Sequence, residues 1–394
     1  MRNAASDPVR RLVAARAIRA FADGFASVLL ARYLKTLGFS GWQIGVLVTA
    51  TLVGSAAMTL WAGLRLTRFG ARPVLLWSCT LTGLTGVGFG ALTGFWPLVV
   101  IGFVGTMNPT GGDVSLFLPT EQAALAHLTT TVERPRRFGV YNLAGALSAA
   151  VGALASALPS RLAGAFGWNL ARTERLSFLV YVVVGLGAAA MYLPMRSSLP
   201  GPSLTRGLHR SKGIVVRLST LFALDSAGGG FCLNSLLVLY LYVRFHLSAG
   251  ATGTALAAMG VLSAFSQLAS ARIAARIGLV RTMVFTHLPA NVCLILAGIV
   301  PNPAVAIGLL LVRASLSQMD VPARQALVMR LVEPDERAAA ASITNVPRSL
   351  ATATTPALAG ALLDWSHFGW PLVIGGATKA VYDLLLLAQP LDRD

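Results

Sequence analysis

Charged residues are scarce in this chain of 394 residues, and acidic residues are scarcer than basic ones. Only 12% of the residues are charged while 55% are hydrophobic, and the mean hydropathy is +0.69. Soluble domains typically carry about 25% charged residues, so this composition excludes an ordinary soluble protein. Each membrane-spanning helix needs roughly 20 apolar residues, so twelve spans would take about 240 residues and leave only short connections. The sequence therefore predicts a polytopic membrane protein without a large soluble domain.

The chain also has few residues of the kinds that build metal sites or catalytic centres. Its three cysteines, Cys79, Cys232 and Cys293, all fall within apolar runs, where buried and unpaired thiols are expected. Their spacing fits neither a disulfide framework nor a metal site. A nucleophile elbow and a glycine-rich phosphate loop are both missing, so we expect no enzyme activity, no cofactor and no metal. The N-terminus is basic and polar and lacks a small-residue cleavage site, which argues against a removable signal peptide.

The formal net charge of +17 has two candidate explanations, a nucleic-acid partner or membrane topology. If the basic residues set the topology, they should gather in every second loop, because cytoplasmic loops are enriched in lysine and arginine. With the N-terminus inside, the cytoplasmic segments contain Arg2, Arg10, Arg11, Arg65, Arg68, Arg72, Arg134, Arg136, Arg137, Arg196, Arg206, Arg210, Lys212, Arg217, Arg272, Arg276 and Arg281. The outer connections contain fewer: Arg32, Lys35, Arg161, Arg172, Arg175 and Arg244. We therefore expect a multi-pass protein of the cell membrane, with both termini in the cytoplasm and no nucleic-acid partner.

One polar stretch occurs twice in this apolar chain, about two hundred residues apart. Aligning Pro119 on Pro322 also matches Gln122 with Gln325, Ala123 with Ala326, Leu128 with Leu331, Glu133 with Glu336, Arg134 with Arg337 and Asn142 with Asn345. One aligned position differs in charge, because Glu121 corresponds to Arg324. An internal duplication of this kind predicts a membrane protein built from two like halves.

Ionisable residues interrupt the first apolar run, 13–35. Arg16, Arg19 and Asp23 fall at i, i+3 and i+7, which places them on one face of a helix. A charge at membrane depth is costly unless it faces the bundle interior or water, so this face is expected to point inward.

Three further runs, 97–127, 214–243 and 304–331, hold ionisable residues at comparable depth. Such residues are functional candidates by default. They are Asp113 and Glu121 in the first of these runs, Asp225 in the second, and Arg313, Asp320 and Arg324 in the third. Asp320 and Arg324 stand at i and i+4 and can pair along their helix. We expect the similarly spaced Lys379 and Asp383 to form a structural pair, and His287 to be a satisfied or interfacial residue.

The loop 63–72 contains Gly63, Arg68, Gly70 and Arg72, and in these residues it resembles the loop between helices two and three of the major facilitator superfamily. The pattern in that family is Gly-x-x-x-Asp-Arg-x-Gly-Arg-Arg, and the residues that match it here are Gly63, Arg68, Gly70 and Arg72. Thr67 replaces the aspartate, which removes the acid on which the cytoplasmic charge cluster of the family depends. A related loop recurs in the second half at 272–281, again without an acid.

This resemblance extends over nearly the whole chain and implies an all-α fold with twelve transmembrane helices in two pseudo-symmetric six-helix bundles. We expect an N-terminal bundle at 1–195, a cytoplasmic linker at 196–213, rich in proline, glycine and serine, and a C-terminal bundle at 214–394. The resemblance also implies secondary transport by alternating access, with helices one, four, seven and ten lining a central cavity.

The first functional hypothesis is proton-coupled efflux of a small organic solute by a monomeric transporter in the lipid bilayer. Asp113, Asp225 and Asp23, in that order, are the candidates for taking up and releasing the proton. An alternative is a carrier for an organic or phosphate-like anion, bound by Arg313 and Arg324 as bidentate forks. Movement of an amphiphile or lipid is a third possibility, and a non-transporting receptor is a fourth.

A second hypothesis concerns gating by Glu121 and Arg324. Equivalent residues of two halves related by an axis along the membrane normal face each other across that axis. We predict a salt bridge between these two side chains at the cytoplasmic mouth, formed when the cavity opens outward and broken when it opens inward. The alternative is that each residue pairs within its own half.

Overall fold

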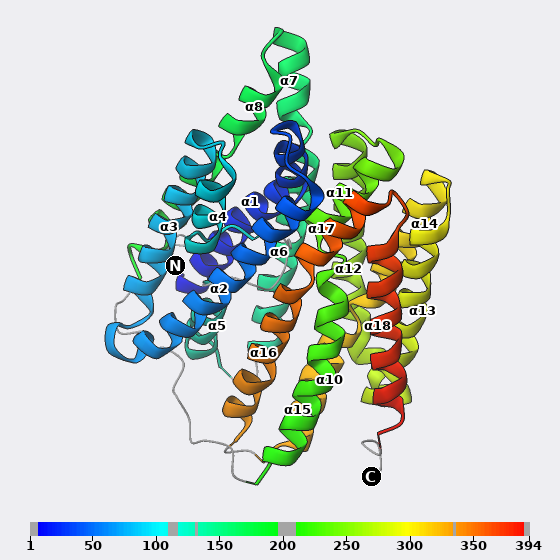
Figure 1. The fold of residues 1–394 in the computed structure, drawn as a ribbon. Coiled ribbons are helices and arrows are strands. Elements are labelled where there is room, and N and C mark those ends of the chain that lie inside the picture. Colours follow the sequence, from blue (N-terminus) through cyan, green and yellow to red (C-terminus); the bar gives the residue numbers. More distant parts are fainter. Residues whose placement is uncertain (1–6, 109–116, 131–132, 196–209, 334–335, 390–394) are drawn as a thin grey trace.

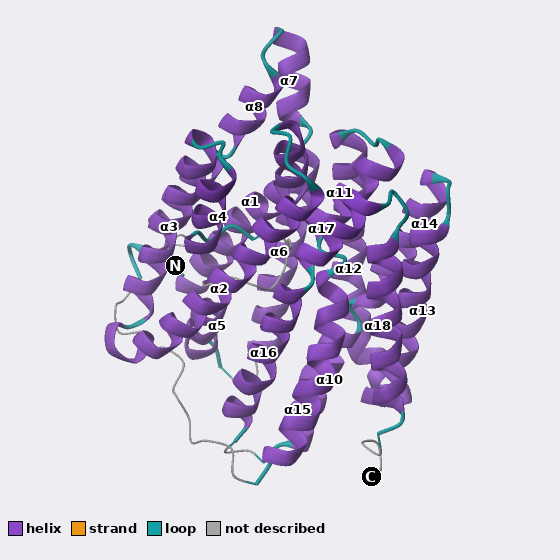
Figure 2. Cartoon of the chain, viewed as in Figure 1, coloured by secondary structure: helices purple, strands orange, loops and turns teal. Residues whose placement is uncertain are grey.

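The computed structural model describes residues 7–108, 117–130, 133–195, 210–333 and 336–389, and in these residues every regular element is a helix. Figures 1 and 2 show long helices running side by side through the molecule. The first half contains α1 (Pro8–Thr36), α2 (Gly41–Phe69), α3 (Ala71–Ala91), α4 (Phe95–Val104), α5 (Phe117–Leu128), α6 (Arg134–Ala155), α7 (Leu158–Phe166), α8 (Leu170–Ser177) and α9 (Val180–Tyr192).

The second half contains another nine helices in the described residues. They are α10 (Lys212–Gly230), α11 (Asn234–Phe245), α12 (Ala249–Ile277), α13 (Leu279–Ile299), α14 (Pro303–Ser317), α15 (Asp320–Leu331), α16 (Arg337–Thr354), α17 (Pro356–Trp365) and α18 (Trp370–Leu387). Over the described chain, nine helical stretches are long and apolar enough to cross a membrane, and α4 is a shorter apolar helix. The protein is therefore a multi-pass membrane protein. Its division at 196–213 stays a prediction, because 196–209 lie outside the described residues.

The duplication seen in the sequence is repeated in the lengths of the helices. α2 and α12 both have 29 residues, and α3 and α13 both have 21. α5 and α15 both have 12 residues and occupy equivalent places in the alignment of Pro119 with Pro322. A single glycine joins each long pair, Gly70 with φ 76° and Gly278 with φ 90°. Only glycine adopts such a φ readily, which accounts for the glycine at this place in both copies of the loop.

Three of the apolar runs expected as continuous helices are interrupted, and one of them, 214–243, is divided between Gly230 of α10 and Asn234 of α11. The predicted helix 304–331 stops at Ser317 and resumes at Asp320, and α12 supports the break, because the Ser270 hydroxyl donates to the Met319 carbonyl at 2.6 Å. Side-chain donors of this kind satisfy backbone groups that a broken membrane helix releases. The predicted helix 97–127 is divided into α4 and α5, and 109–116 between them lie outside the described residues.

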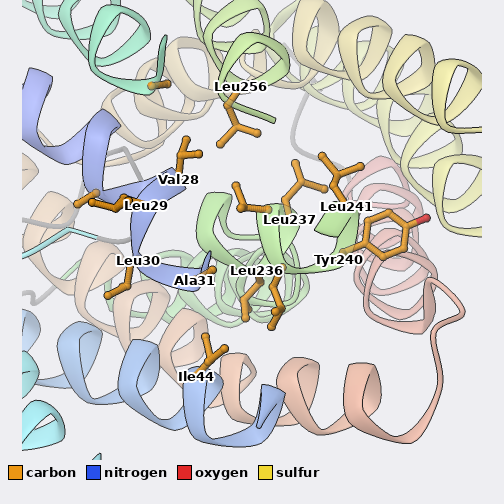
Figure 3. Close-up of a cluster of buried hydrophobic side chains, with 14 of the residues drawn as sticks. Val28, Leu29, Leu30, Ala31, Ile44, Leu236, Leu237, Tyr240, Leu241 and Leu256 are labelled. Atoms are coloured by element: carbon orange, nitrogen blue, oxygen red, sulfur yellow. The ribbon is translucent and has the colours of Figure 1, made fainter. Parts of the chain in front are cut away.

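The two halves meet in a seam at the end of the molecule where α1 ends and α2 begins, which we call the seam end. There α1 packs on α11, α2 packs on α17, and α6 packs on α12. Figure 3 shows the apolar part of this seam, in which side chains of α1 and α11 point toward one another. Val28 and Ala31 of α1, and Leu237 and Leu241 of α11, are all at most 3% exposed. Apolar burial therefore holds the halves together at this end.

Close backbone approach and one carboxylate complete the seam. A Cβ atom added to Gly360 of α17 would lie 1.9 Å from the carbonyl oxygen of Gly41 in α2, so side chains larger than glycine do not fit there. Asp364 of α17 accepts hydrogen bonds from the backbone N–H groups of Gly41 and Trp42, at 2.6 and 2.7 Å. A carboxylate at these free N–H groups caps the start of α2 from the opposite half.

Widening this backbone contact should open the seam. We expect Gly360→Val to push α17 away from α2 and to lengthen the distance between spin labels at residues 92 and 305, which are exposed positions of the two halves at this end. Electron–electron resonance spectroscopy on the labelled protein, with its own cysteines replaced, measures that distance. Gly308→Val is the matched control, because a Cβ at Gly308 meets nothing within 4 Å. Unchanged distances in Gly360→Val would contradict a seam held by glycine contacts.

Candidate functional site

A buried cluster of polar side chains lies in the first half and is centred on Glu121 of α5. Glu121 has no exposed surface and forms an ion pair with Arg19 of α1. The hydroxyls of Tyr141 in α6 and Tyr192 in α9 donate to the same carboxylate, the first at 2.5 Å. The Arg19 guanidinium also lies 3.9 Å from the ring centroid of Phe117, the first residue of α5. Glu121 therefore links four helices of one half.

A second buried cluster lies in the other half and is centred on Asp225 of α10. Lys379 of α18 donates to Asp225 at 2.6 Å, and Arg324 of α15 donates to it at 3.4 Å. Arg324 also donates to Asp320 at 3.0 Å, which confirms the pairing along the helix expected from their spacing. All four side chains are at most 7% exposed. Acids and bases are thus matched inside this half as well.

The two clusters are related by the duplication, but with the signs of the charges exchanged. In the first half the base, Arg19, is on the first helix and the acid, Glu121, is on α5. In the second half the acid, Asp225, is on the first helix and the base, Arg324, is on α15. Glu121 and Arg324 occupy equivalent positions, so the difference in charge between the repeats is compensated by the partner on the first helix of each half.

This arrangement bears on the predicted salt bridge between Glu121 and Arg324. In this structure each of them pairs within its own half, which is the alternative that the sequence left open. The bridge between them stays a prediction for a conformation in which the cavity opens outward.

Four residues of the second cluster, Lys379, His287, Asn291 and Asp383, were not identified from the sequence as site residues. His287 of α13 lies 2.9 Å from Asp383 through Nδ1 and 3.7 Å from Asp225 through Nε2. Asn291 donates to Asp383 at 2.8 Å. The expected pair between Lys379 and Asp383 is wrong, because Lys379 bonds Asp225 while Asp383 bonds His287 and Asn291. His287 is a satisfied buried residue, as expected, and it connects α13 to α10 and α18.

Asp23 has surroundings unlike those of the other acids at this depth. It is 8% exposed and lines a small pocket together with Arg19, Thr82 and Tyr181. Among the described residues, no basic nitrogen lies within 4 Å of its carboxylate. Arg19, Arg16 and the Tyr181 hydroxyl interact with this carboxylate from neighbouring positions, so Asp23 is a buried carboxylate that borders a small pocket without a direct ion pair.

Two arginines at membrane depth also have no ion pair in the described part of the chain. Arg16 of α1 is 8% exposed, and its guanidinium lies 5.7 Å from the ring centroid of Tyr141. Arg313 of α14 is half-buried. The Nε atoms of both side chains are buried and have no hydrogen-bond partner. A buried donor without a partner is costly, so both positions are candidates for binding an anionic group.

The remaining predicted site residues fall at the junction of α2 and α3 or outside the described residues. Gly70 is the junction itself, and Arg72 in the first turn of α3 is half-buried. Gly63 and Arg68 belong to α2, but the side chains of 62–69 are outside the described part of the molecule, and so is all of Asp113. The predicted residues thus gather inside each half, and the binding roles expected for them stay predictions.

Breaking the ion pair of the first cluster should destabilise the protein strongly. Arg19→Gln is expected to lower the free energy of unfolding by about 3–5 kcal/mol, because it leaves the Glu121 carboxylate buried without a cation. The double variant Arg19→Met, Glu121→Leu should recover most of that loss, since it removes both charges. Guanidinium unfolding of the protein in detergent micelles measures these differences. Arg16→Gln is the control and should cost far less, and a double variant as unstable as Arg19→Gln alone would contradict this explanation.

The chain matches the family model of the Major Facilitator Superfamily over residues 12–318 and again over 218–393. It is similar to the uncharacterized membrane protein YJR124C of Saccharomyces cerevisiae, with 23% identity over 99% of this chain and 95% of the yeast protein. Among solved structures, it resembles the D-xylose-proton symporter, with a TM-score of 0.76, 14% identity, and coverage of 96% of this chain and 97% of the symporter.

The human organic anion transporter MFSD10 is a further structural relative, with a TM-score of 0.67, 17% identity, and coverage of 96% of this chain and 99% of that one. At these identities the likeness to both solved structures establishes the fold alone. The matches to the family model cover most of the chain, and they agree with the duplicated helices and the loops at Gly70 and Gly278. The chain is therefore a member of the Major Facilitator Superfamily, and it is a membrane transporter and not an enzyme.

Proposed function

We propose that this transporter moves a small organic solute across the cell membrane as a monomer, coupled to the movement of protons. The observation that carries the proposal is the Asp23 carboxylate, which is buried at membrane depth, borders a pocket and has no ion pair among the described residues. An ionised carboxylate is costly in such surroundings, and binding a proton removes its charge. A relative of the same fold is named a D-xylose-proton symporter, which makes proton coupling compatible with this architecture.

The other acids at this depth are less suited to the role. Asp225 contacts two basic side chains, Lys379 and Arg324, and Glu121 is held by Arg19 and two tyrosines. Separating either carboxylate from its basic partners would leave an unmatched charge in the interior. Among the described acids, we therefore place Asp23 ahead of Asp225 as the proton-binding residue and assign the two clusters to holding each half together.

We further propose that the seam end faces the outside and that the opposite end faces the cytoplasm. The basic residues support this orientation. Helix starts and ends at the opposite end hold Arg10, Arg11, Arg72, Arg134, Arg136, Arg137, Arg210, Lys212, Arg276 and Arg281, whereas those at the seam end hold Arg32, Lys35, Arg161, Arg172, Arg175 and Arg244. Cytoplasmic ends of membrane helices carry the excess of lysine and arginine. With this orientation, the structure is closed toward the outside.

Labelling of single cysteines in intact cells tests the orientation. We expect a cysteine at residue 164, in the projecting hairpin of α7 and α8 (Figure 1), to react with a membrane-impermeant maleimide added outside. A cysteine at exposed residue 212 should react only after the cells are permeabilised. Both are introduced into a chain whose own cysteines are replaced. The reverse pattern of labelling would show that the proposed orientation is wrong.

A second candidate substrate class is the organic anion. Arg313 and Arg16 support it, because each has a buried Nε without a hydrogen-bond partner and neither forms an ion pair with a described residue. A guanidinium offers paired donors that match a carboxylate or phosphate. Arg324, the other arginine expected for this role, is engaged by Asp225 and Asp320. Another relative of the same fold is named an organic anion transporter.

Transport measurements with a neutralised carboxylate test the proton coupling. A thermal-shift screen of neutral and anionic organic solutes on the purified protein first supplies a ligand. In proteoliposomes containing a pH-sensitive dye, that solute should drive proton movement, and its sign distinguishes efflux by exchange from uptake with a proton. Asp23→Asn should abolish solute-driven proton movement while exchange of labelled solute continues, because the charge change on proton binding is removed.

Asp7→Asn is the matched control on the same helix. Asp7 caps the start of α1 by accepting from the N–H of Val9, a role that asparagine also performs, so this variant should keep full coupling. Undiminished solute-driven proton movement in Asp23→Asn would exclude Asp23 as the coupling residue. If Arg313→Gln weakens binding of anionic ligands only, the anion hypothesis gains support; equal weakening for neutral ligands contradicts it.

A further inference from the structure

A groove lies between the starts of α1 and α6, away from both ion clusters. Its volume is about 310 Å³, within the range of about 300–1,000 Å³ typical of ligand pockets. Five small apolar side chains and two arginines line it: Val9, Val13, Ala14, Ala17, Val140, Arg10 and Arg137. An apolar groove with basic side chains among its lining matches the shape of an amphiphile with an anionic head.

The groove opens toward lipid. Along α6, Val140 continues a stripe of exposed apolar side chains, with Val140 49%, Leu147 39% and Val151 56% exposed. The other side of α6 faces α12 in the second half, where an added Cβ on Gly253 would lie 2.5 Å from the carbonyl oxygen of Ala153. Exposed apolar stripes of membrane-spanning helices face the hydrocarbon of the bilayer.

The two arginines are free to bind a ligand. The Arg10 side chain is exposed and the Arg137 side chain is half-buried, and neither has a hydrogen bond or an ion pair with any described residue. The acids at these helix starts, Asp7 and Glu133, are not part of the groove lining. Asp7 is already bonded to the N–H of Val9. The groove therefore has positive charge that the described part of the protein does not neutralise.

We propose that this groove is a binding site for an acidic phospholipid, whose phosphate contacts Arg10 and Arg137 and whose acyl chain lies along the apolar lining. Charge complementarity and the opening toward lipid support a lipid over a soluble anion, because a free phosphate has no use for the apolar part. In the proposed orientation the lipid belongs to the cytoplasmic leaflet. The site does not depend on the proposed proton coupling, since none of its lining residues belongs to the Asp23 pocket or to either ion cluster.

Lipid retention by the purified protein tests the site. Native mass spectrometry counts the lipids that remain bound after exchange into detergent with added phosphatidylglycerol or phosphatidylcholine, and a thermal shift provides a second readout. We expect the protein to retain phosphatidylglycerol in preference to phosphatidylcholine. The substitutions Arg10→Gln and Arg137→Gln should each weaken the binding of phosphatidylglycerol about fivefold. Ala17→Phe fills the apolar part without a change of charge and should weaken retention as well.

A control variant on the same helix and a soluble phosphate compound complete the test of the groove. Arg136→Gln removes an exposed arginine that does not line the groove, so it should leave retention unchanged. Glycerol phosphate tests the soluble source and should give no thermal shift at the same concentration. Equal retention of the two lipids, equal losses in Arg136→Gln, or an equal shift with glycerol phosphate would each overturn the proposal.

Discussion

Charges buried in a bilayer need partners that remain with them when the protein changes conformation. Here the partners belong to the same half: Arg19 with Glu121, and Asp225 with Lys379 and Arg324. Since each cluster joins helices of a single bundle, the bundles can move relative to each other without separating a buried ion pair. The contacts that such a movement has to break are of another kind, namely apolar side chains, glycine backbone contacts and the partly exposed Asp364. Strong interactions are thus placed within the halves and weaker ones between them.

Much of the fold could be predicted from the sequence, because apolar runs and the duplication are local or periodic signals. The membrane class, the family and the glycine junction at Gly70 all follow from such signals. The alignment of Pro119 with Pro322 also falls on two helices of equal length, α5 and α15, although both were expected to be parts of longer helices. The breaks in the helices were not predicted, although Pro322 marks one of them, because proline has no N–H to donate to the carbonyl of Gln318 four residues earlier. The hydroxyl of Ser270 on a neighbouring helix also stabilises the break by donating to the Met319 carbonyl, a contact that no pattern within 304–331 reveals.

The candidate site was predicted only in part, and the errors have a common cause. Spacing along one helix correctly paired Asp320 with Arg324, yet the same argument wrongly paired Lys379 with Asp383. Both pairs have i,i+4 spacing, which brings side chains near each other but does not exclude stronger partners on other helices. Lys379 lies where α18 approaches α10, so the carboxylate of Asp225 competes successfully. Which helices are neighbours in space is information that a single sequence without aligned relatives does not contain.

The exchange of charge between the repeats shows how the halves have become different. The duplication placed Glu121 and Arg324 at equivalent positions, and a change of sign at either one is tolerated only if its partner on the first helix changes too. Such compensated pairs preserve stability and consequently distinguish poorly between possible functions. The side chains without an ion pair, Asp23 and Arg16 in one half and Arg313 in the other, are less fully explained by stability, because each lies at membrane depth without a direct ionic contact to a described residue. A solute or a proton that interacts with them would supply the missing compensation, and this is the physical reason to look for the transport site among the unpaired residues instead of the paired ones.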